Sequence, residues 1–320
     1  MKKKQIFMFS GQGSQYYQMG KELYENNATF KKAMHVCNEI ATPLLGGASL
    51  IDAMYPENKK GEAFDRLLYT SPALISVQYS MASLLKEKDI LPDLTLGYSL
   101  GEIVAAIVSG IITLEDGLKL VINMAYQAEE KTPRGKMLAI VADKMIIAND
   151  PDLFSSCWLA GTNFPGNFVV SGLAEDILEL QKALQKEGIT TQELPVNQGF
   201  HCPLIDGMEI DFKKEIANYK IFDQVTPFIS SYKTEIVEEI TEDYFWEVIR
   251  YPVNFQRTIL NLIEKEDGIF IDLGPSGSLA TSVKYILSRN NDSVPYQIMN
   301  QYGRNLQMLE KFITGITVSI

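Results

Sequence analysis

Residues that bind metals or form disulfides are scarce in this chain. Its 320 residues include two histidines and three cysteines, and the cysteines are far apart in sequence, at Cys37, Cys157 and Cys202. An odd number of distant cysteines excludes a disulfide framework, and without a Cys-x-x-Cys pair we expect no metal site. No glycine-rich segment has the Gly-Lys-Ser/Thr ending or the glycine spacing of a nucleotide-binding loop, so we expect no bound cofactor.

Long apolar runs are lacking too. No segment approaches the roughly 18 uncharged apolar residues that a membrane-spanning helix requires, so we expect no membrane association. Three lysines follow Met1, but the apolar run at residues 6–9 ends at Ser10 and is too short for a signal peptide. We interpret this run as the first strand of a folded, cytoplasmic protein.

Positive charge is in deficit, because 29 lysines and arginines face 40 aspartates and glutamates, for a formal net charge of −11. Binding to nucleic acid requires clustered positive charge, so this balance argues against it. An acidic protein partner would need a local basic patch to overcome the repulsion. The length predicts one large or two unequal domains, and nothing in the sequence requires more than a monomer.

The strongest functional signal is Gly-Tyr-Ser-Leu-Gly at residues 97–101. It occurs once, between a strand expected at residues 92–96 and an apolar helix expected at residues 103–108. In this context Gly-x-Ser-x-Gly presents the serine hydroxyl above a helix N-terminus, as in an acyl-transfer nucleophile. The amide of Leu100 would then face the oxyanion that forms when Ser99 attacks a carbonyl. The alternative is a serine in an ordinary loop between a strand and a helix.

Strands and helices alternate along most of the chain, which predicts an open α/β sheet with its ligand crevice at the carboxyl ends of the strands. Between residues 131 and 197 the elements become short, which predicts a small α+β domain inserted into a large domain of residues 1–130 and 198–320. The strands are expected at residues 6–9, 92–96, 137–142, 158–161, 168–171, 225–230 and 268–273. The helices are expected at residues 19–40, 72–86, 103–108, 114–129, 174–187, 244–263 (interrupted by Pro252) and 279–288.

A serine hydroxyl needs a base within hydrogen-bond reach, and histidine suits this task near neutral pH. His35 lies among charged residues of a predicted amphipathic helix, where a solvated position explains it. His201 lies in an apolar and aromatic segment, so we select it as the base. The alternative is a histidine at the edge of the core that bonds to a backbone carbonyl. Cys202 is a poorer candidate nucleophile than Ser99, because neighbours in an extended segment point to opposite sides.

Six segments, in the same order along the chain, resemble motifs of the malonyl-CoA:acyl carrier protein transacylase family and of the acyltransferases that serve polyketide synthases. The segments are residues 9–15, 97–102, 163–172, 199–201, 252–255 and 272–275. The resemblance covers essentially the whole chain. It implies a hydrolase-like open α/β core that carries a small ferredoxin-like α+β domain, with the active site between them.

The resemblance also assigns roles to residues. It implies Ser99 as the nucleophile and His201 as the base, with the backbone amides of Gln12 and Leu100 as the oxyanion hole. In that family a backbone carbonyl, rather than a carboxylate, orients the histidine. The matching position in this sequence is Asn254.

This sequence departs from the family where malonyl is bound. Malonyl-transferring members have Leu-Val-x-x-Arg-Gly in the helix after the nucleophile, and the arginine holds the malonyl carboxylate. Here residues 120–125 read Leu-Val-Ile-Asn-Met-Ala, so Met124 stands in the arginine's place. A buried carboxylate without a partner costs on the order of 3–5 kcal/mol, whereas a thioether makes an adaptable apolar wall. We therefore expect malonyl to bind poorly and uncharged acyl chains to bind well.

Three further residues are expected to bind substrate. Tyr98 replaces the histidine that is usual before the serine, and Asn163 and Phe200 lie in matching motifs. Arg134 or Lys136 would be the alternative source of a cation for a malonyl carboxylate. Both lie in a connecting segment, where exposed charges are usually only solvated.

These departures favour an acyl hydrolase of the kind that accompanies polyketide synthases without built-in acyltransferases. Such an enzyme would release stalled, uncharged acyl groups from acyl carrier proteins through an acyl-Ser99 intermediate. A first alternative is an acyltransferase that loads malonyl or a neutral acyl group from CoA onto a carrier protein, and a second is a non-catalytic module that binds carrier protein. The expected partners are thus acyl carrier protein and small acyl thioesters, with docking placed around Lys131, Arg134 and Lys136.

Overall fold

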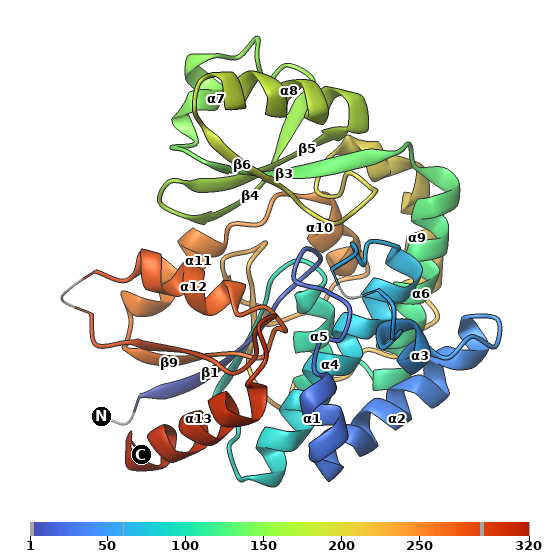
Figure 1. Ribbon diagram of the computed structural model, residues 1–320, viewed down its shortest axis with the longest axis vertical. Coiled ribbons are helices and arrows are strands. Elements are labelled where there is room, and N and C mark those ends of the chain that lie inside the picture. The colour runs from blue at the N-terminus through green and yellow to red at the C-terminus, as the bar shows by residue number, and fades with distance from the viewer. Residues whose placement is uncertain (1–2, 60, 289–290, 320) are drawn as a thin grey trace.

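Two β-sheets organise the computed structural model, which describes residues 3–59, 61–288 and 291–319 (Figure 1). The larger sheet has the strand order β10-β9-β1-β2-β7-β8, and all neighbours are parallel except β7 and β8. The smaller sheet is antiparallel, in the order β4-β5-β3-β6. The strands are β1 (Lys4–Phe9), β2 (Leu94–Gly97), β3 (Gly135–Val141), β4 (Cys157–Phe164), β5 (Asn167–Leu173), β6 (Thr190–Glu193), β7 (Phe228–Ser230), β8 (Glu235–Ile236), β9 (Gly268–Asp272) and β10 (Val294–Gln297).

Helices cover both faces of the larger sheet. The helices of the large domain are α1 (Lys21–Asn26), α2 (Ala28–Leu44), α3 (Leu50–Met54), α4 (Leu67–Glu87), α5 (Gly101–Val108), α6 (Leu114–Lys131), the 3-10 helix η1 (Pro203–Met208), α9 (Glu209–Ile216), α10 (Tyr244–Arg250), α11 (Phe255–Ile263), α12 (Ser278–Ile286) and α13 (Asn305–Ser319). Across the described ranges, no helix combines the length and the apolar character needed to cross a membrane.

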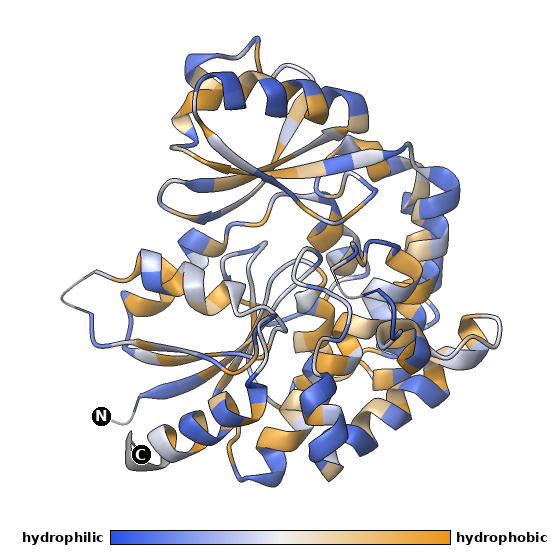
Figure 2. Cartoon of the chain, viewed as in Figure 1, coloured by the Kyte–Doolittle hydropathy of each residue, from blue (hydrophilic) through white to orange (hydrophobic). Residues whose placement is uncertain are grey.

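Side chains of the central strand β1 alternate between two cores, because successive residues of a strand point to opposite faces. Ile6 and Met8 pack with Leu96 in the cluster that includes α11 and α12. Phe7 and Phe9 pack in the larger cluster that includes α2, α4, α5 and α6. Figure 2 shows the same division, with hydrophobic residues concentrated where helices face the strands. The nearly continuous apolar sequence of β1 is what a strand buried on both faces requires.

The smaller sheet is covered by helices on one face only, the face that lies away from the large domain (Figure 1). Leu138, Phe168 and Val170 pack there in a cluster that includes α8 (Ala174–Lys186), close to the short α7 (Met145–Asn149). This small domain has its sheet within residues 135–193, inside the expected range of 131–197. The predicted fold class, an α/β core with a small ferredoxin-like α+β domain, is confirmed.

Backbone hydrogen bonds join the two domains at Val253. Its amide donates to the carbonyl of Ala160 at 2.9 Å, and its carbonyl accepts from the amide of Thr162 at 2.9 Å. Strand β4 of the small domain is therefore fixed to the segment between α10 and α11 of the large domain. That segment also holds part of the candidate active site.

The predicted strands and helices are present, but several ends differ. The helix expected at residues 19–40 is divided at Asn27, whose side chain caps α2 by accepting from the amide of Phe30 at 2.9 Å. The helix expected from residue 72 begins at Leu67. The strand expected at residues 225–230 is limited to β7, since Pro227 before it has no N–H to donate. Strands β6, β8 and β10 and helices α3, α7, η1, α9 and α13 were not predicted.

Candidate active site

The turn between β2 and α5 holds Ser99 in a strained backbone conformation. Its φ of 54° lies in the left-handed region, which residues other than glycine rarely occupy. The two glycines of the motif permit close approach. A Cβ on Gly101 would lie 1.9 Å from the carbonyl oxygen of Phe9, and one on Gly97 would lie 2.2 Å from Cα of Glu102. Helix α5 can begin directly against β1 and β2 because positions 97 and 101 lack side chains.

His201 lies within hydrogen-bond distance of Ser99, although the two residues are distant in sequence. The distance from Ser99 Oγ to His201 Nε2 is 2.7 Å, and the distance from His201 Nδ1 to the carbonyl oxygen of Tyr251 is also 2.7 Å. Because a carbonyl oxygen only accepts, Nδ1 carries the proton and Nε2 can accept the proton of the Ser99 hydroxyl. The structure therefore brings the expected nucleophile and base together in a working geometry.

The carbonyl that orients His201 belongs to Tyr251, so the assignment of this role to Asn254 was wrong. Tyr251 directly follows α10 and precedes Pro252, and the residue before a proline is driven into an extended conformation. The carbonyl of Tyr251 therefore leaves the helix and turns to the imidazole. The backbone carbonyl of Asn254 is used elsewhere, because it accepts from the amide of Thr258 at 3.0 Å and from Thr258 Oγ1 at 2.9 Å.

Burial keeps His201 in its neutral form. The residue is 3% exposed, and burial lowers its pKa from 6.5 to about 4. The hydrogen bond to the Tyr251 carbonyl acts in the opposite direction without offsetting burial. A neutral imidazole near pH 7 is the form that can take a proton from Ser99.

Gln12 and Leu100 both line the cavity in front of the serine. Leu100 directly precedes α5, where backbone N–H groups have no partner within the helix. The turn that carries Gln12 packs tightly on this one, because a Cβ on Gly11 would lie 2.6 Å from the carbonyl oxygen of Tyr98 and 3.3 Å from the Leu100 nitrogen. The two backbone segments predicted to form an oxyanion hole are therefore adjacent, and the role of their amides stays a prediction.

The side chain of Gln12 is occupied by contacts with α4. Its Nε2 donates to Ser71 Oγ at 2.8 Å, and its Oε1 accepts from Thr70 Oγ1 at 3.1 Å. These two bonds hold the amide group of the side chain on the helix. Only the backbone of Gln12 is then suited to contact a substrate oxygen.

A cavity of about 140 Å³ lies in front of Ser99 and His201, with walls from both domains. Alternation along the small sheet turns Met137, Ala139 and Val169 toward this cavity, while their neighbours pack against α8. The apolar lining is completed by Met124, Leu194, Phe200, Ile249 and Leu279. Among the described residues that line the cavity there is no lysine, arginine, aspartate or glutamate.

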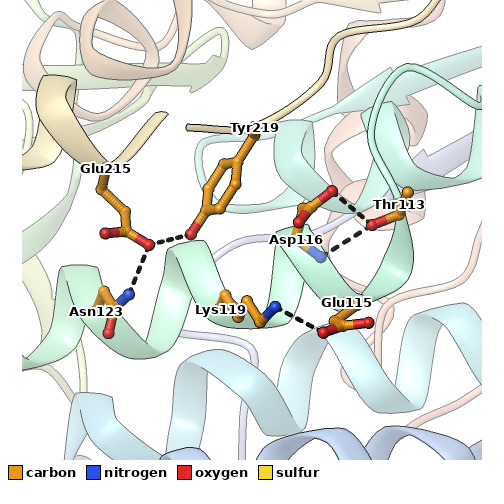
Figure 3. Close-up of polar contacts among 7 residues, drawn as sticks. All are labelled: Thr113, Glu115, Asp116, Lys119, Asn123, Glu215 and Tyr219. Carbon is orange, nitrogen blue, oxygen red and sulfur yellow. Dashed lines mark hydrogen bonds and ion pairs between the residues drawn. The ribbon is translucent and has the colours of Figure 1, made fainter. Parts of the chain in front are cut away.

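Met124 faces this cavity from α6, as its place in the sequence predicted, and is 2% exposed. The preceding residue anchors the helix on another side. Asn123 Nδ2 donates to Glu215 Oε1 at 2.8 Å, and the hydroxyl of Tyr219 donates to the same oxygen (Figure 3). These contacts fix α6 and place a thioether, rather than a cation, in the wall of the cavity.

The start of α6 is fixed by its own sequence. Thr113 Oγ1 accepts a hydrogen bond from the amide of Asp116 at 3.0 Å, which caps the helix (Figure 3). One turn further on, Lys119 Nζ lies 2.6 Å from Glu115 Oε1. This ion pair is exposed and contributes little to stability, so the cap and the contacts of Asn123 determine where Met124 lies.

The other residues expected to bind substrate also line the cavity. The Tyr98 hydroxyl donates to Asn163 Oδ1 at 2.8 Å, and Asn163 Nδ2 donates to Asn167 Oδ1 at 2.7 Å. Burial raises the pKa of Tyr98 well above its usual value, so its hydroxyl stays a donor. Phe200 lines the cavity directly before His201.

The alternative cations do not reach the cavity. Neither Arg134 nor Lys136 lines it, and Lys136 pairs with Glu193 at 2.6 Å. Arg134 lines a separate surface cavity together with Glu129. Within the described part of the chain, no group of three or more histidine, cysteine, aspartate or glutamate side chains is placed to hold a metal ion.

Several residues of the site were not predicted from the sequence. The cavity residues Met137, Ala139 and Val169 were predicted to lie in strands. Alternation along those two strands was the signal that would have placed their side chains. Leu194 and Ile249 had no such signal, because they enter the cavity from a loop and from the end of α10. Tyr251 was missed because its role uses only the backbone.

The fold and the site define a class of protein. Its members have the α/β acyltransferase fold, in which a serine and a histidine face a cavity between a large and a small domain. Residues 6–319 match the family described as acyl transferase domain, and the chain belongs to this family of enzymes. A polyketide biosynthesis acyltransferase homolog, BaeD of Bacillus velezensis, is 38% identical over 311 residues, which cover 96% of each chain. The homolog PksD of Bacillus subtilis is 34% identical over 312 residues, which cover 97% of this chain and 96% of the relative.

Solved structures show the same fold. A malonyl CoA-acyl carrier protein transacylase from Clostridium perfringens superposes with a TM-score of 0.81 at 24% identity, with 98% of each chain covered. The acyltransferase domain from the second module of the salinomycin polyketide synthase superposes with a TM-score of 0.86 at 25% identity, covering 99% of this chain and 74% of that one.

Proposed function

We propose that this protein is an acyl hydrolase of polyketide biosynthesis that releases uncharged acyl groups from acyl carrier proteins. The observation that carries the proposal is the cavity in front of Ser99, which is lined by apolar and neutral polar side chains. A malonyl carboxylate there would be desolvated without a cationic partner, which costs on the order of 3–5 kcal/mol. An acetyl group or a longer alkyl chain loses nothing by entering such a cavity and gains from leaving water.

The chemistry follows from the two hydrogen bonds of His201. Its Nε2 takes the proton of Ser99 as Oγ attacks the thioester carbonyl, and the amides of Gln12 and Leu100 bind the oxyanion. When the tetrahedral intermediate collapses, the C–S bond breaks and His201 returns the proton to the departing thiol. His201 then activates a water molecule, which attacks the acyl ester and restores the Ser99 hydroxyl. The protein needs no cofactor of its own for these steps.

The partners follow from the same proposal. The acyl group would arrive on the phosphopantetheine of an acyl carrier protein or on a small acyl thioester. The relatives support this, since BaeD and PksD are called polyketide biosynthesis acyltransferase homologs and a solved relative is called a malonyl CoA-acyl carrier protein transacylase. Of the three cations expected at the docking surface, Lys131 and Lys136 are engaged with Asp211 and Glu193. Arg134 is the third cation of the expected docking surface.

The second candidate function is transfer of the acyl group from Ser99 to another carrier protein. The family supports it, because its members are acyltransferases and both reactions share the acyl-serine intermediate. A non-catalytic binding module is disfavoured by the 2.7 Å contact of Ser99 with a neutral His201, which binding alone would not require.

The test is to incubate the protein with carrier protein loaded with acetyl, a longer acyl chain or malonyl, and to follow the mass of the carrier. Acetyl and longer acyl carriers should return to the unloaded form, and malonyl carrier should persist. A second carrier of different mass, added as an acceptor, separates the two reactions, because transfer would load it and hydrolysis would not. Preferential release of malonyl would overturn the substrate assignment, and Ser99→Ala should abolish both release and the acyl-enzyme.

A further inference from the structure

A fully buried carboxyl group lies directly behind the nucleophile. Glu102 is 0% exposed and its amide donates to the carbonyl of Ser99 at 2.8 Å. Its side chain does not line the catalytic cavity. The carboxyl group can occupy this place because Gly97 has no side chain. A Cβ at position 97 would lie 2.6 Å from Glu102 Cγ.

Three donors converge on this carboxyl group. Glu102 Oε1 accepts from Ser231 Oγ at 2.9 Å and from the amide of Tyr232 at 3.0 Å, and Oε2 accepts from the hydroxyl of Tyr244. Burial raises the pKa of Glu102 to about 7, while the three donors act to lower it. A carboxylate only accepts, so these partners are arranged for the ionised form. An apolar side chain at position 102 would avoid the cost of desolvating a carboxylate. The presence of a buried carboxyl group with three donors therefore requires an explanation.

The three donors belong to the segments that hold Tyr251, whose carbonyl orients His201. Tyr244 begins α10, the helix that Tyr251 directly follows. The ring of Tyr232 stacks on the ring of Tyr251, with centroids 5.7 Å apart and an interplanar angle of 17°. Just after Tyr251, the amide of Asn254 donates to the carbonyl of Ser231.

The same short segment also holds the backbone of the histidine. The amide of His201 donates to the carbonyl of Ile249 at 2.9 Å, while its Nδ1 donates to the carbonyl of Tyr251. The segment 249–251 thus fixes both the chain position and the ring orientation of the base. A carboxylate that fixes this segment fixes the base relative to Ser99, because the same carboxylate is carried by α5.

We propose that Glu102 is a positioning residue that ties the nucleophile helix α5 to α10 and so holds the Tyr251 carbonyl in line with His201. In serine hydrolases with a triad, a carboxylate contacts the histidine directly and selects its tautomer. Here the carboxylate acts one step away, through Ser231, Tyr232 and Tyr244, on a backbone carbonyl. The inference rests on the Ser99 and His201 pair of the proposed function, and not on whether the acyl group passes to water or to a carrier.

The test compares Glu102→Gln with the wild-type enzyme. The glutamine keeps the size of the side chain but replaces one acceptor by an NH2 donor, which would face donors that are already in place. With a neutral acyl ester as substrate, kcat for acylation of Ser99 should fall about tenfold to a hundredfold, as for other displacements of catalytic groups, while KM stays nearly constant. A fall in apparent kcat that only matches the loss of folded protein, or a change confined to KM, would contradict the proposal.

The second readout reports the histidine itself. The described chain contains His35, which is exposed, and His201, so a sample labelled with 15N-histidine gives two ring spectra that are easily assigned. In the wild type, His201 Nδ1 should carry the proton and Nε2 should be unprotonated. In Glu102→Gln the Nδ1 proton should exchange faster with water and the two tautomers should mix. An unchanged His201 spectrum in the folded variant would overturn the proposal.

Two further variants make the outcome specific. Asp272→Asn is the matched control, because Asp272 is another fully buried carboxyl group, and it accepts from the amides of Gly274 and Ala280 at 2.8 and 2.9 Å. It should lower stability and leave the His201 spectrum unchanged. Tyr244→Phe keeps Glu102 and removes one donor, so it should move the His201 spectrum in the same direction by a smaller amount. If wild-type Ser99 is not acylated, the proposed function fails, whereas the tautomer readout still decides the role of Glu102.

Discussion

At the scale of single residues, the site depends on two residues whose backbone conformations are both unfavourable. Ser99 has φ of 54° and His201 has φ of 61°, and each such residue costs about 1–3 kcal/mol. Local propensity would not select these conformations. They persist because α5 is pressed against β1 and β2 on one side, and because the segment ending at Tyr251 holds the histidine on the other.

The identity of residue 124 should decide between charged and uncharged acyl groups. Met124→Arg would place a guanidinium in a cavity whose described lining has no other charge, so malonyl loading of Ser99 should rise by at least about tenfold through a charge-assisted bond, and release of neutral chains should weaken. The acyl-enzyme formed from malonyl and acetyl thioesters can be measured by mass. Met124→Leu, which keeps an apolar wall, is the control and should retain the preference for neutral chains.

The pH dependence of acylation should follow the lowered pKa of His201. With a pKa of about 4, the neutral base is present throughout the range from pH 8 to about pH 5.5, so titration of His201 should lower the rate of Ser99 acylation only as the pH approaches 4. A break near pH 7 is expected from Glu102 and should be absent in Glu102→Gln, where residue 102 does not titrate. A break near 6.5 that persists in Glu102→Gln would show that the imidazole of His201 is not buried. His201 should also lower the free energy of unfolding as the pH falls from about 6.5 to 4. The unfolded chain protonates this histidine below pH 6.5, whereas the folded chain does so only near pH 4.

At the scale of elements, short contacts between backbones position the site. Helix α5 reaches the end of β1 only because residue 101 is glycine. Helix α10 ends at Arg250 because Pro252 drives Tyr251 into an extended conformation. Strand β3 contributes by alternation, with Met137 and Ala139 toward the cavity and the residue between them, Leu138, in the core of the small domain.

The approach of α5 should be sensitive to a single methyl group. Gly101→Ala would place Cβ 1.9 Å from a backbone oxygen that cannot rotate away, so the free energy of unfolding should fall by at least about 2 kcal/mol, with loss of Ser99 reactivity. Chemical denaturation measures this change. Gly315→Ala is the control in another helix, where the nearest atom outside the helix would be 3.8 Å away, and it should leave stability unchanged or slightly higher.

At the scale of the whole molecule, the cavity exists because two domains meet. The large domain supplies Ser99 and His201, and the unpartnered face of the small sheet supplies much of the apolar wall. The hydrogen bonds of Ala160 and Thr162 with Val253 join that sheet to the segment that orients His201. The wall and the base are therefore held by the same junction.

The small domain should set the limit on acyl length. Ala139→Leu adds bulk to the wall from that side, so release of longer acyl chains should fall about tenfold relative to acetyl, as for other pockets narrowed by a few methylene groups. Competition between acetyl and longer acyl carriers measures the ratio. Leu138→Ala is the control, since the adjacent side chain points to the opposite face. It should reduce stability by roughly 2–5 kcal/mol without changing the ratio.

Most elements of the fold were predictable from the chain because their signals are local. Alternating apolar runs, the turn residues and the change in texture near residue 131 identified the two domains. The elements that were missed have weak local signals, such as the polar strand β6 (Thr190–Glu193), which lies at the edge of the small sheet and is mostly exposed. Its strand conformation comes from pairing with β3, which only the folded chain provides.

The sequence by itself determined the candidate nucleophile, the candidate base and the absence of an arginine at position 124, because these depend on residue types within short motifs. The tertiary structure decided which carbonyl orients His201, which side chains wall the cavity and where Arg134 and Lys136 lie. A backbone carbonyl leaves no mark in the sequence of its own residue, as Tyr251 shows. The cavity is equally invisible there, because its walls come from segments that meet only when the two sheets have packed.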